Sequence, residues 1–193
     1  MHAVTRTRRH VALVGLRCSG KSSVGRELAQ LLHAPFVDLD DELTRVANST
    51  AGSARFASAG DVLAQWGETT FRSLESQVLR EVLEAREGRV LATGGGAVLA
   101  PANRAQLALR ARCIWLRAGP AELARRLRAD PTPRPSLTGR DPGDELVELA
   151  RARGPLYAEV ADWTLETAAH TPTELARLVF EHLVEDKSSR DGG

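Results

Sequence analysis

The chain has 193 residues, enough for one well-packed domain and too few for two of ordinary size. Its formal net charge is only +1, so bulk electrostatics gives no reason to expect a nucleic-acid or membrane partner. No apolar stretch approaches the roughly 20 residues that span a bilayer. The two cysteines give no sign of a disulfide framework, so we expect reduced thiols in a cytoplasmic protein. Since no apolar stripe stands out beyond the core-facing ones, we expect a monomer.

Both ends of the chain are polar. Residues 1–9 carry three arginines and no acid, which predicts a flexible basic arm, too short for a transit peptide and without the apolar core of a signal sequence. Residues 185–193 end in Gly-Gly and are typical of a disordered tail. The stretch between them, 10–184, is predicted to form a single domain.

Apolar runs alternate with amphipathic segments along that domain. The expected strands are 11–15, 35–39, 89–93, 112–117 and 162–167. The expected helices are about 21–33, 68–87, 101–110, 120–129, 143–152 and 172–185. This alternation predicts an α/β fold with a parallel sheet covered by helices on both faces. In such folds, ligands gather at the carboxyl ends of the strands.

The first expected strand leads into residues 15–22, Gly-Leu-Arg-Cys-Ser-Gly-Lys-Ser, which fit the phosphate-binding pattern G-x-x-x-x-G-K-[ST]. Backbone N–H groups and the helix dipole would hold a phosphate, while Lys21 would reach the outer phosphates and Ser22 would place its hydroxyl on Mg²⁺. A helix start without a ligand would not explain two glycines around a lysine at the end of a buried strand. The pattern therefore predicts a nucleoside triphosphate site.

The second expected strand ends in Asp38-Leu39-Asp40-Asp41. Strand alternation would place Asp38 and Asp40 on the same side, at the sheet edge where the phosphate loop emerges. One carboxylate could then serve Mg²⁺ and the other hold an acceptor hydroxyl. An acidic strand end can also cap the following helix, a role that we expect for Asp41 and Glu42.

The next stretch, 47–59, is small and polar, which predicts a loose surface excursion. Beyond it, Arg72 and Glu75 share a face near the start of a helix. Such a pair is either a surface ion pair or, if this helix end faces the pocket, part of a substrate site.

The third expected strand ends in Gly94-Gly95-Gly96. This is either a flexible turn or a place where unusual backbone geometry lets a small ligand approach main-chain N–H groups. Residues 151–157 offer a further guanidinium beside a helix break, and arginine suits bidentate recognition of a carboxylate. These residue types indicate a small hydroxylated carboxylate as the acceptor.

Residues 130–143 hold four prolines together with Arg134 and Arg140. Proline blocks helix formation and arginine supplies positive charge. Beside a phosphate loop, this composition favours a lid that closes over the phosphates rather than an ordinary solvated loop.

In their order along the chain, these features resemble shikimate kinases over residues 9–184. They are the phosphate loop, Asp-x-Asp, Phe-Arg-x-x-Glu at 71–75, the three glycines, Arg-Pro at 134–135 and Arg-x-Pro-Leu-Tyr at 153–157. The resemblance implies a three-layer P-loop kinase fold, with a five-stranded parallel sheet in the order 2-3-1-4-5, a mobile lid and a substrate-binding helical region at about 41–80. It implies transfer of the γ-phosphoryl group of ATP to the 3-hydroxyl of shikimate, in aromatic amino acid biosynthesis, with Mg²⁺ as cofactor.

The resemblance also implies site residues by position. The catalytic residues would be Asp40, which holds the reacting hydroxyl, with Lys21 and Arg134 stabilising phosphate charge. The shikimate site would comprise Asp40, Arg72, Glu75, Gly94, Gly95, Gly96 and Arg153. The ATP site would comprise Gly15, Cys18, Ser19, Gly20, Lys21, Ser22, Ser23, Arg126, Arg134 and Pro172. The metal would lie at Ser22 and Asp38.

Cys18 departs from the family pattern, because this position is often glycine, and the stretch 47–59 is longer than in typical members. Two alternatives remain at this point. A gluconate kinase would share the phosphate loop but not the full set of motifs. A ligand-sensing domain without catalysis would carry a DNA-binding region or eroded catalytic positions, and this chain keeps Lys21, Asp40 and Arg153.

Overall fold

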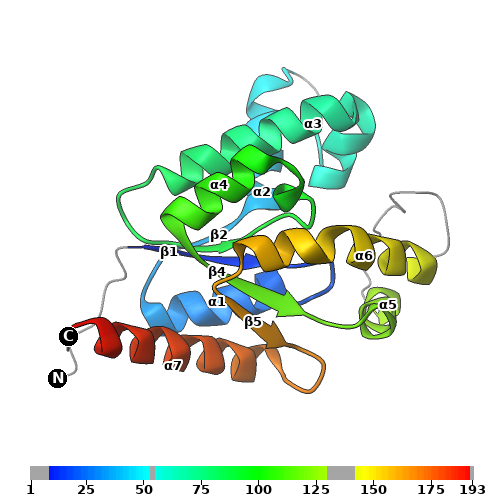
Figure 1. Cartoon of the computed structure of the whole chain (residues 1–193). Coiled ribbons are helices and arrows are strands. Elements are labelled where there is room, and N and C mark those ends of the chain that lie inside the picture. Colours follow the sequence, from blue (N-terminus) through cyan, green and yellow to red (C-terminus); the bar gives the residue numbers. More distant parts are fainter. Residues whose placement is uncertain (1–8, 53–54, 130–141, 192–193) are drawn as a thin grey trace.

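The structure is a computed structural model that describes residues 9–52, 55–129 and 142–191. Its five strands form one parallel sheet in the order β2-β3-β1-β4-β5 (Figure 1), which confirms the expected fold class and strand order. The strands are β1 (His10–Val14), β2 (Phe36–Asp38), β3 (Val90–Ala92), β4 (Ala111–Arg117) and β5 (Trp163–Glu166). β1 pairs with β3 and β4 and is buried along its whole length, as its continuous apolar run predicts.

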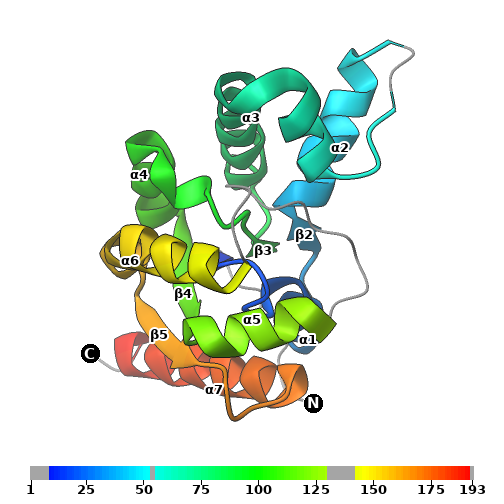
Figure 2. The ribbon, with the colours of Figure 1, turned by 90° about the vertical axis from the view of Figure 1, so that its right-hand side faces the viewer.

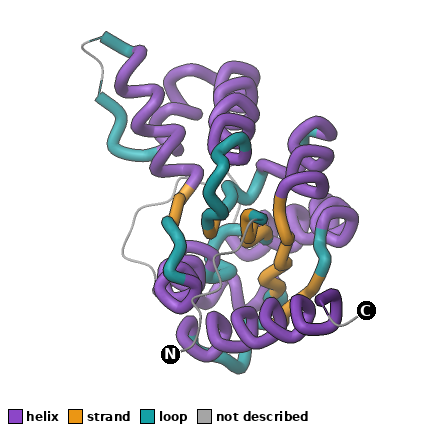
Figure 3. Tube along the Cα trace, turned by 90° about the vertical axis from the view of Figure 1, so that its left-hand side faces the viewer, coloured by secondary structure: helices purple, strands orange, loops and turns teal. Residues whose placement is uncertain are grey.

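Helices cover both faces of the sheet. They are α1 (Lys21–Leu32), α2 (Leu39–Thr50), α3 (Ala59–Leu83), α4 (Pro101–Arg110), α5 (Pro120–Ala129), α6 (Pro142–Val160) and α7 (Pro172–Asp191), with a short 3-10 helix η1 (Ala97–Leu99). In Figure 1, α1 and α7 lie on one face, and α3, α4 and α6 lie on the other. Figure 3 shows the strands enclosed between the helices. Among the described residues, no helix is both long and apolar enough to cross a bilayer.

The side chains of β1 divide between two cores because successive residues of a strand point to opposite faces. Val11 and Leu13 pack with apolar residues of α1 and α7, whereas Ala12 and Val14 pack with apolar residues of α3 and α6. Both faces of β1 are thus fixed by packing. The phosphate loop that follows Val14 starts from this rigid central strand.

The described parts of the segment 47–59, which exclude residues 53–54, are not the loose excursion that the sequence predicts. Residues 47–50 complete α2, and α3 starts at Ala59. The Asn48 side chain donates to the Phe56 carbonyl (3.0 Å) and accepts from the Phe56 N–H (2.8 Å). Phe56 is only 4% exposed and meets the Trp66 ring edge-on. These contacts fix Phe56 against α2 and α3, which lie side by side beyond β2 (Figure 2).

Three helices extend beyond their predicted ends. α3 begins at Ala59 rather than 68 and bends at Gly67, where φ is +77°, so the expected start marks the bend. α6 continues through Pro155 to Val160. The predicted break at 151–157 is therefore wrong. Pro155 removes one backbone hydrogen bond of the helix, and the free energy gained by burying Tyr157 in the core compensates for that loss. α7 continues to Asp191, six residues past its predicted end at 185.

Candidate active site

The phosphate loop takes its shape from two glycines with positive φ. Gly15 has φ +142°, and a Cβ atom there would lie 2.5 Å from the Leu116 carbonyl oxygen of the neighbouring strand. Gly20 has φ +95° and precedes α1, whose first turn has no acidic residue. Any other residue would be strained at these two positions. The loop therefore presents a helix N-terminus that is open to an anion.

Cys18 also adopts the left-handed conformation, with φ +62°. This conformation costs a side chain with a Cβ atom roughly 1–2 kcal/mol relative to glycine. The backbone geometry thus explains why glycine suits this position of the loop. In this chain the loop keeps its shape although it has to accommodate a partly buried thiol.

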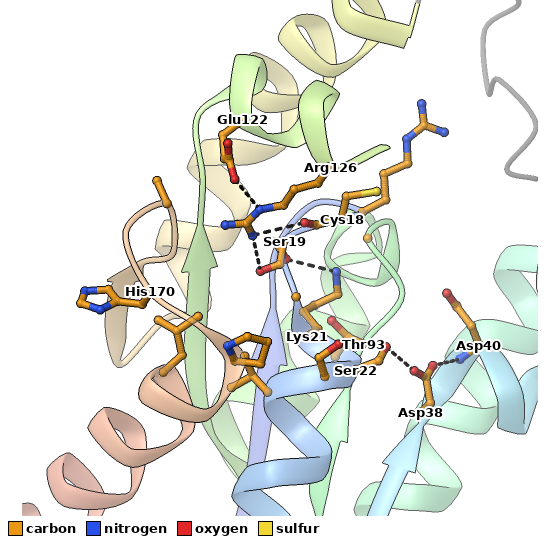
Figure 4. A pocket seen from close by; sticks show the side chains of 18 of the residues that line it. Cys18, Ser19, Lys21, Ser22, Asp38, Asp40, Thr93, Glu122, Arg126 and His170 are labelled. Atoms are coloured by element: carbon orange, nitrogen blue, oxygen red, sulfur yellow. Dashed lines mark hydrogen bonds and ion pairs between the residues drawn. The ribbon is translucent and has the colours of Figure 1, made fainter. Parts of the chain in front are cut away.

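Lys21 curls back over the loop that precedes it. Its Nζ donates to the carbonyl oxygens of Gly15 (2.9 Å) and Leu16 (2.7 Å) and lies 3.5 Å from Ser19 Oγ. The ammonium group therefore lies against the backbone of the loop (Figure 4). There it can exchange carbonyl contacts for phosphate oxygens.

Arg126 of α5 spans the outer side of the same loop (Figure 4). It donates to the Cys18 carbonyl (3.4 Å) and to the Thr167 carbonyl (2.8 Å), and its Nε donates to Glu122 (2.7 Å). Hydrogen bonds from Arg125 and then from Arg126 lower the pKa of Glu122 to about 2. Glu122 therefore stays ionised at neutral pH and holds Arg126 against the loop.

A cavity of 460 Å³ opens above these residues. Of the predicted ATP-site residues, it is lined by Cys18, Ser19, Gly20, Lys21, Ser22, Ser23, Arg126 and Pro172. Its wall also includes Asp38, Asp40 and Gly95. Of the residues predicted for the acceptor, only Asp40 and Gly95 line this cavity.

Asp38 contacts the phosphate-loop helix through Ser22, whose Oγ donates to Asp38 Oδ2 at 2.5 Å. β2 ends at Asp38 and α2 begins at the next residue, so strand alternation does not relate Asp38 to Asp40 as the sequence predicts. Instead, Asp38 caps α2 by accepting the Asp40 N–H (3.1 Å). Asp41 and Glu42 lie in the first turn and are not the cap. The helix turn, rather than the strand, presents Asp40 to the cavity.

The three glycines that follow β3 are needed for space. None of them has a positive φ, so the expected unusual backbone conformation is wrong. A Cβ atom on Gly94 would lie 2.8 Å from Asp40 Oδ1 and 2.9 Å from Glu75 Oε1, and one on Gly96 would lie 2.3 Å from Arg72 Nη1. The turn therefore lies against α2 and α3 at the point where their charged side chains converge.

Arg153 and Tyr157 reach the same turn from α6. Arg153 Nη1 donates to the Gly95 carbonyl at 3.0 Å and Tyr157 Oη donates to the same oxygen at 2.6 Å. Burial raises the pKa of Tyr157 to about 12, so its hydroxyl keeps the proton that it donates. Tyr157 follows Arg153 by one helical turn, a spacing that could have indicated their shared contact.

Glu75 lies against the glycine turn, beside Asp40. Arg72 Nη1 donates to its Oε2 at 2.8 Å. Burial raises the pKa of Glu75, and the nearby charges of Arg72 and Arg153 partly oppose that increase, while the charge of Asp40 adds to it. Two arginines and two carboxylates thus act on one another within this small region, which suits recognition of a small anionic molecule.

The predicted site and the observed cavity differ in several residues. Arg134 and residues 130–141 of the predicted lid lie outside the described residues. Residues that line the cavity without having been predicted are Arg17, Val24, Thr93, Glu122, Arg125, Ala168, His170 and Leu175. Of these, Glu122 could have been found from its four-residue spacing to Arg126. Arg17 lies within the phosphate-loop pattern itself, whereas Thr93, His170 and Leu175 depend on how distant segments meet.

Comparison with known proteins agrees with this geometry. A family model described as shikimate kinase matches residues 17–184. The chain belongs to the shikimate kinase family. Among shikimate kinases, the protein from Cupriavidus pinatubonensis is 42% identical over 176 residues, which cover 91% of this chain and 86% of that relative. A solved structure of shikimate kinase from Acinetobacter baumannii in complex with shikimate is 34% identical, with a TM-score of 0.83, and covers 94% of this chain and 96% of that one.

A more distant likeness bears on the gluconate alternative. The structure of a gluconokinase from Sinorhizobium meliloti has a TM-score of 0.56 at 17% identity and covers 96% of this chain and 99% of that one. At that identity the likeness concerns the fold alone. It therefore agrees with the common P-loop kinase architecture and carries no argument for gluconate as the acceptor.

Proposed function

We propose that the chain phosphorylates the 3-hydroxyl of shikimate with ATP, releasing ADP and shikimate 3-phosphate. The observation that carries this proposal is the continuity of the phosphate-loop cavity with Asp40 and Gly95, beside the group formed by Arg72, Glu75 and Arg153. The first part suits a triphosphate, and the second suits a hydroxylated carboxylate. Membership of the shikimate kinase family supports the choice of this carboxylate.

The reaction requires the acceptor hydroxyl to meet the γ-phosphorus in line with the leaving oxygen. In the proposed arrangement, Asp40 holds that hydroxyl by accepting its hydrogen bond and takes its proton as the new P–O bond forms. The bond between the γ-phosphorus and the bridging oxygen breaks, and its electron pair leaves with ADP. Lys21 stabilises the charge on the transferred group, and we propose the same role for Arg134.

The acceptor carboxylate would be bound by Arg72 and Arg153. Glu75 accepts a hydrogen bond from Arg72, and the Gly95 carbonyl accepts one from Arg153. Each guanidinium is thus oriented before the acceptor arrives, which reduces the entropy lost on binding. Gly94 and Gly96 leave room for the Asp40 and Glu75 carboxylates and for the Arg72 guanidinium, and we propose that Gly95 lies beside the bound ring.

The residues near the phosphate loop fit Mg²⁺. A hydroxyl and a carboxylate, on Ser22 and Asp38, adjoin each other within the cavity wall, and Mg²⁺ prefers such oxygen ligands. Among the described residues there is no group of three or more His, Cys, Asp or Glu side chains that could form an all-protein cage. This agrees with a metal that is held largely by substrate phosphates and water. When bound, it would neutralise phosphate charge.

The adenine would lie toward Arg126 and Pro172, at the end of the cavity away from Asp40. Residues 10–184 would form one catalytic domain that works as a cytoplasmic monomer, with a lid at about 130–143.

A coupled assay of ADP release tests the proposal by comparing shikimate, quinate and gluconate, with Mg²⁺ and with EDTA. We expect turnover with shikimate that depends on Mg²⁺, and little with the other two acids. Folded protein that hydrolyses or binds ATP but does not phosphorylate shikimate would overturn the proposal. Preference for gluconate would favour a gluconate kinase. Shikimate binding without turnover would favour a ligand-sensing domain without catalysis.

A further inference from the structure

An ion pair ties the phosphate loop to helix α6, and the phosphate-binding pattern does not require it. Arg17 occupies one of the variable positions of the loop, and its Nη2 lies 2.6 Å from Glu145 Oε1 in the first turn of α6. The Glu145 side chain is fully buried and that of Arg17 is 13% exposed. A buried pair of this kind resists separation, because opposite charges attract strongly where little water screens them.

The same helix carries Arg153 about two turns further along. Arg153 and Tyr157 both donate to the Gly95 carbonyl, as described above. Gly95 in turn lies against the phosphate loop, since a Cβ atom on it would be 3.4 Å from the backbone nitrogen of Arg17. The contacts therefore form a closed ring that runs from Arg17 to Glu145, along α6 to Arg153, and through Gly95 back to the loop.

We propose that Arg17 and Glu145 are positioning residues, whose ion pair fixes the phosphate loop relative to α6. Nucleotide binding to the loop then also restrains Arg153 and the glycine turn. The pair provides a direct contact between the loop that would bind the nucleotide and the helix that carries Arg153, so stabilisation of the loop should reach that helix. The inference rests on the proposed function for the role of Arg153, but its first test does not use the acceptor.

That first test is amide hydrogen exchange along residues 144–157, measured with and without a non-hydrolysable ATP analogue and Mg²⁺. We expect the analogue to slow exchange in the parent by about fivefold or more, the lower end of typical coupling between sites. In Arg17→Met, at saturating analogue, the slowing should fall below about twofold. Equal slowing in the variant and the parent would overturn the proposal, and so would an α6 that does not respond to the analogue in the parent.

Glu159→Gln provides a matched control on the same helix. Glu159 pairs with Arg104 Nε at 2.8 Å, and Arg104 also donates to the Val98 carbonyl, so this pair joins α6 to η1 and α4 rather than to the phosphate loop. We expect the parent response to the analogue in this variant. Should Arg17→Met not fold, Glu145→Gln removes the same pair with almost no change in volume.

A second test separates positioning from a general effect on stability. Each single variant should raise the KM for shikimate at saturating ATP by about fivefold. The exchanged pair, Arg17→Glu with Glu145→Arg, should bring it back toward the parent value. Single variants that lower only the unfolding midpoint, with parent kcat and KM, would make the pair merely structural. If the parent does not act on shikimate at all, the proposed function fails, and hydrogen exchange still decides the role of the pair.

Discussion

Gly94 lies directly against Asp40, so close that a Cβ atom on the glycine would be 2.8 Å from Asp40 Oδ1. The glycine follows β3 and the aspartate lies in the first turn of α2. The carboxylate therefore occupies space that exists only because residue 94 has no side chain. The position of the Asp40 carboxylate in the proposed acceptor site thus depends on the absence of a side chain at Gly94.

Gly94→Ala should displace the Asp40 and Glu75 carboxylates with little effect on folding, because both are the ends of side chains that can move. A displacement of about 1 Å at a reacting group can cost roughly 100-fold in rate, so we expect kcat with shikimate to fall by about 10- to 100-fold while ATP affinity stays near the parent value. Steady-state kinetics and nucleotide titration measure both. Gly119→Ala is the control, since no heavy atom lies within 4 Å of the added Cβ. Parent activity in Gly94→Ala would contradict the spatial argument.

Asp40→Asn keeps the shape of the side chain and removes its ability to take a proton. We expect kcat to fall by about 100- to 10,000-fold, the usual contribution of a positioned base, with ATP affinity changed by less than about twofold. Asp41→Asn changes the neighbouring carboxylate in the same helical turn and should leave kcat near that of the parent. The assignment fails if the two variants have similar turnover.

Cys18→Gly should stabilise the protein, because glycine adopts a φ of +62° without the strain imposed by a Cβ atom. We expect the free energy of unfolding to rise by about 1 kcal/mol, equivalent to roughly 2–4 °C in the unfolding midpoint for a chain of this size. Cys18→Ala retains the Cβ atom and should give no such gain. Thermal unfolding of the two variants side by side checks the prediction, and an equal gain in both would attribute the effect to the thiol instead.

His10 should make the protein less stable in mild acid. Its Nδ1 accepts the Arg89 N–H (3.2 Å), so its Nε2–H donates to the Leu83 carbonyl (3.2 Å). Burial lowers its pKa from 6.5. As the pH falls below 6.5 the unfolded state takes up this proton first, so the stabilisation is complete above that pH and is lost as the pH falls through the lower, folded-state pKa.

Urea unfolding at about pH 7.5 and about pH 5 measures this loss, and comparison with His10→Gln separates His10 from other titrating groups. The variant should lose less stability between the two pH values than the parent. Glu75 works in the opposite direction, because a raised carboxyl pKa favours the folded state as the pH falls. Because the parent and His10→Gln both contain Glu75, its contribution to the pH dependence cancels when the two proteins are compared. If the free energy of unfolding depends on pH identically in the parent and in His10→Gln, His10 is not the cause of the loss of stability in acid.

Local sequence patterns predicted the phosphate loop well, because its geometry depends on neighbours in the chain. Gly15 and Gly20 take the positive φ values that the pattern requires, and Lys21 lies over the loop between them. The positions of the strands followed from their apolar runs. The strand order could be stated only from the resemblance to a known family, since nothing in a single strand specifies its partners.

Contacts between distant segments explain what the sequence did not predict. The Asn48 side chain orders the backbone at Phe56, although the stretch between them has the composition of a loose loop. Burial of Tyr157 keeps α6 helical beyond Pro155. The Asp186 ion pair with Arg112 of β4 supports the extension of α7 past its predicted end. In each case tertiary packing outweighs a local preference of the chain.

The sequence by itself determined the phosphate-loop pattern, the alternation of strands and helices, and the charged residue types of the proposed acceptor site. Only the tertiary structure decided that Asp40 is presented by a helix turn capped by Asp38, that Gly94 and Gly96 are needed for space, and that Arg17 meets Glu145. The reason is physical: a turn conformation is set by residues within a few positions of one another. The clearance around a carboxylate, or the partner of a buried charge, is set by segments that meet only when the chain has folded.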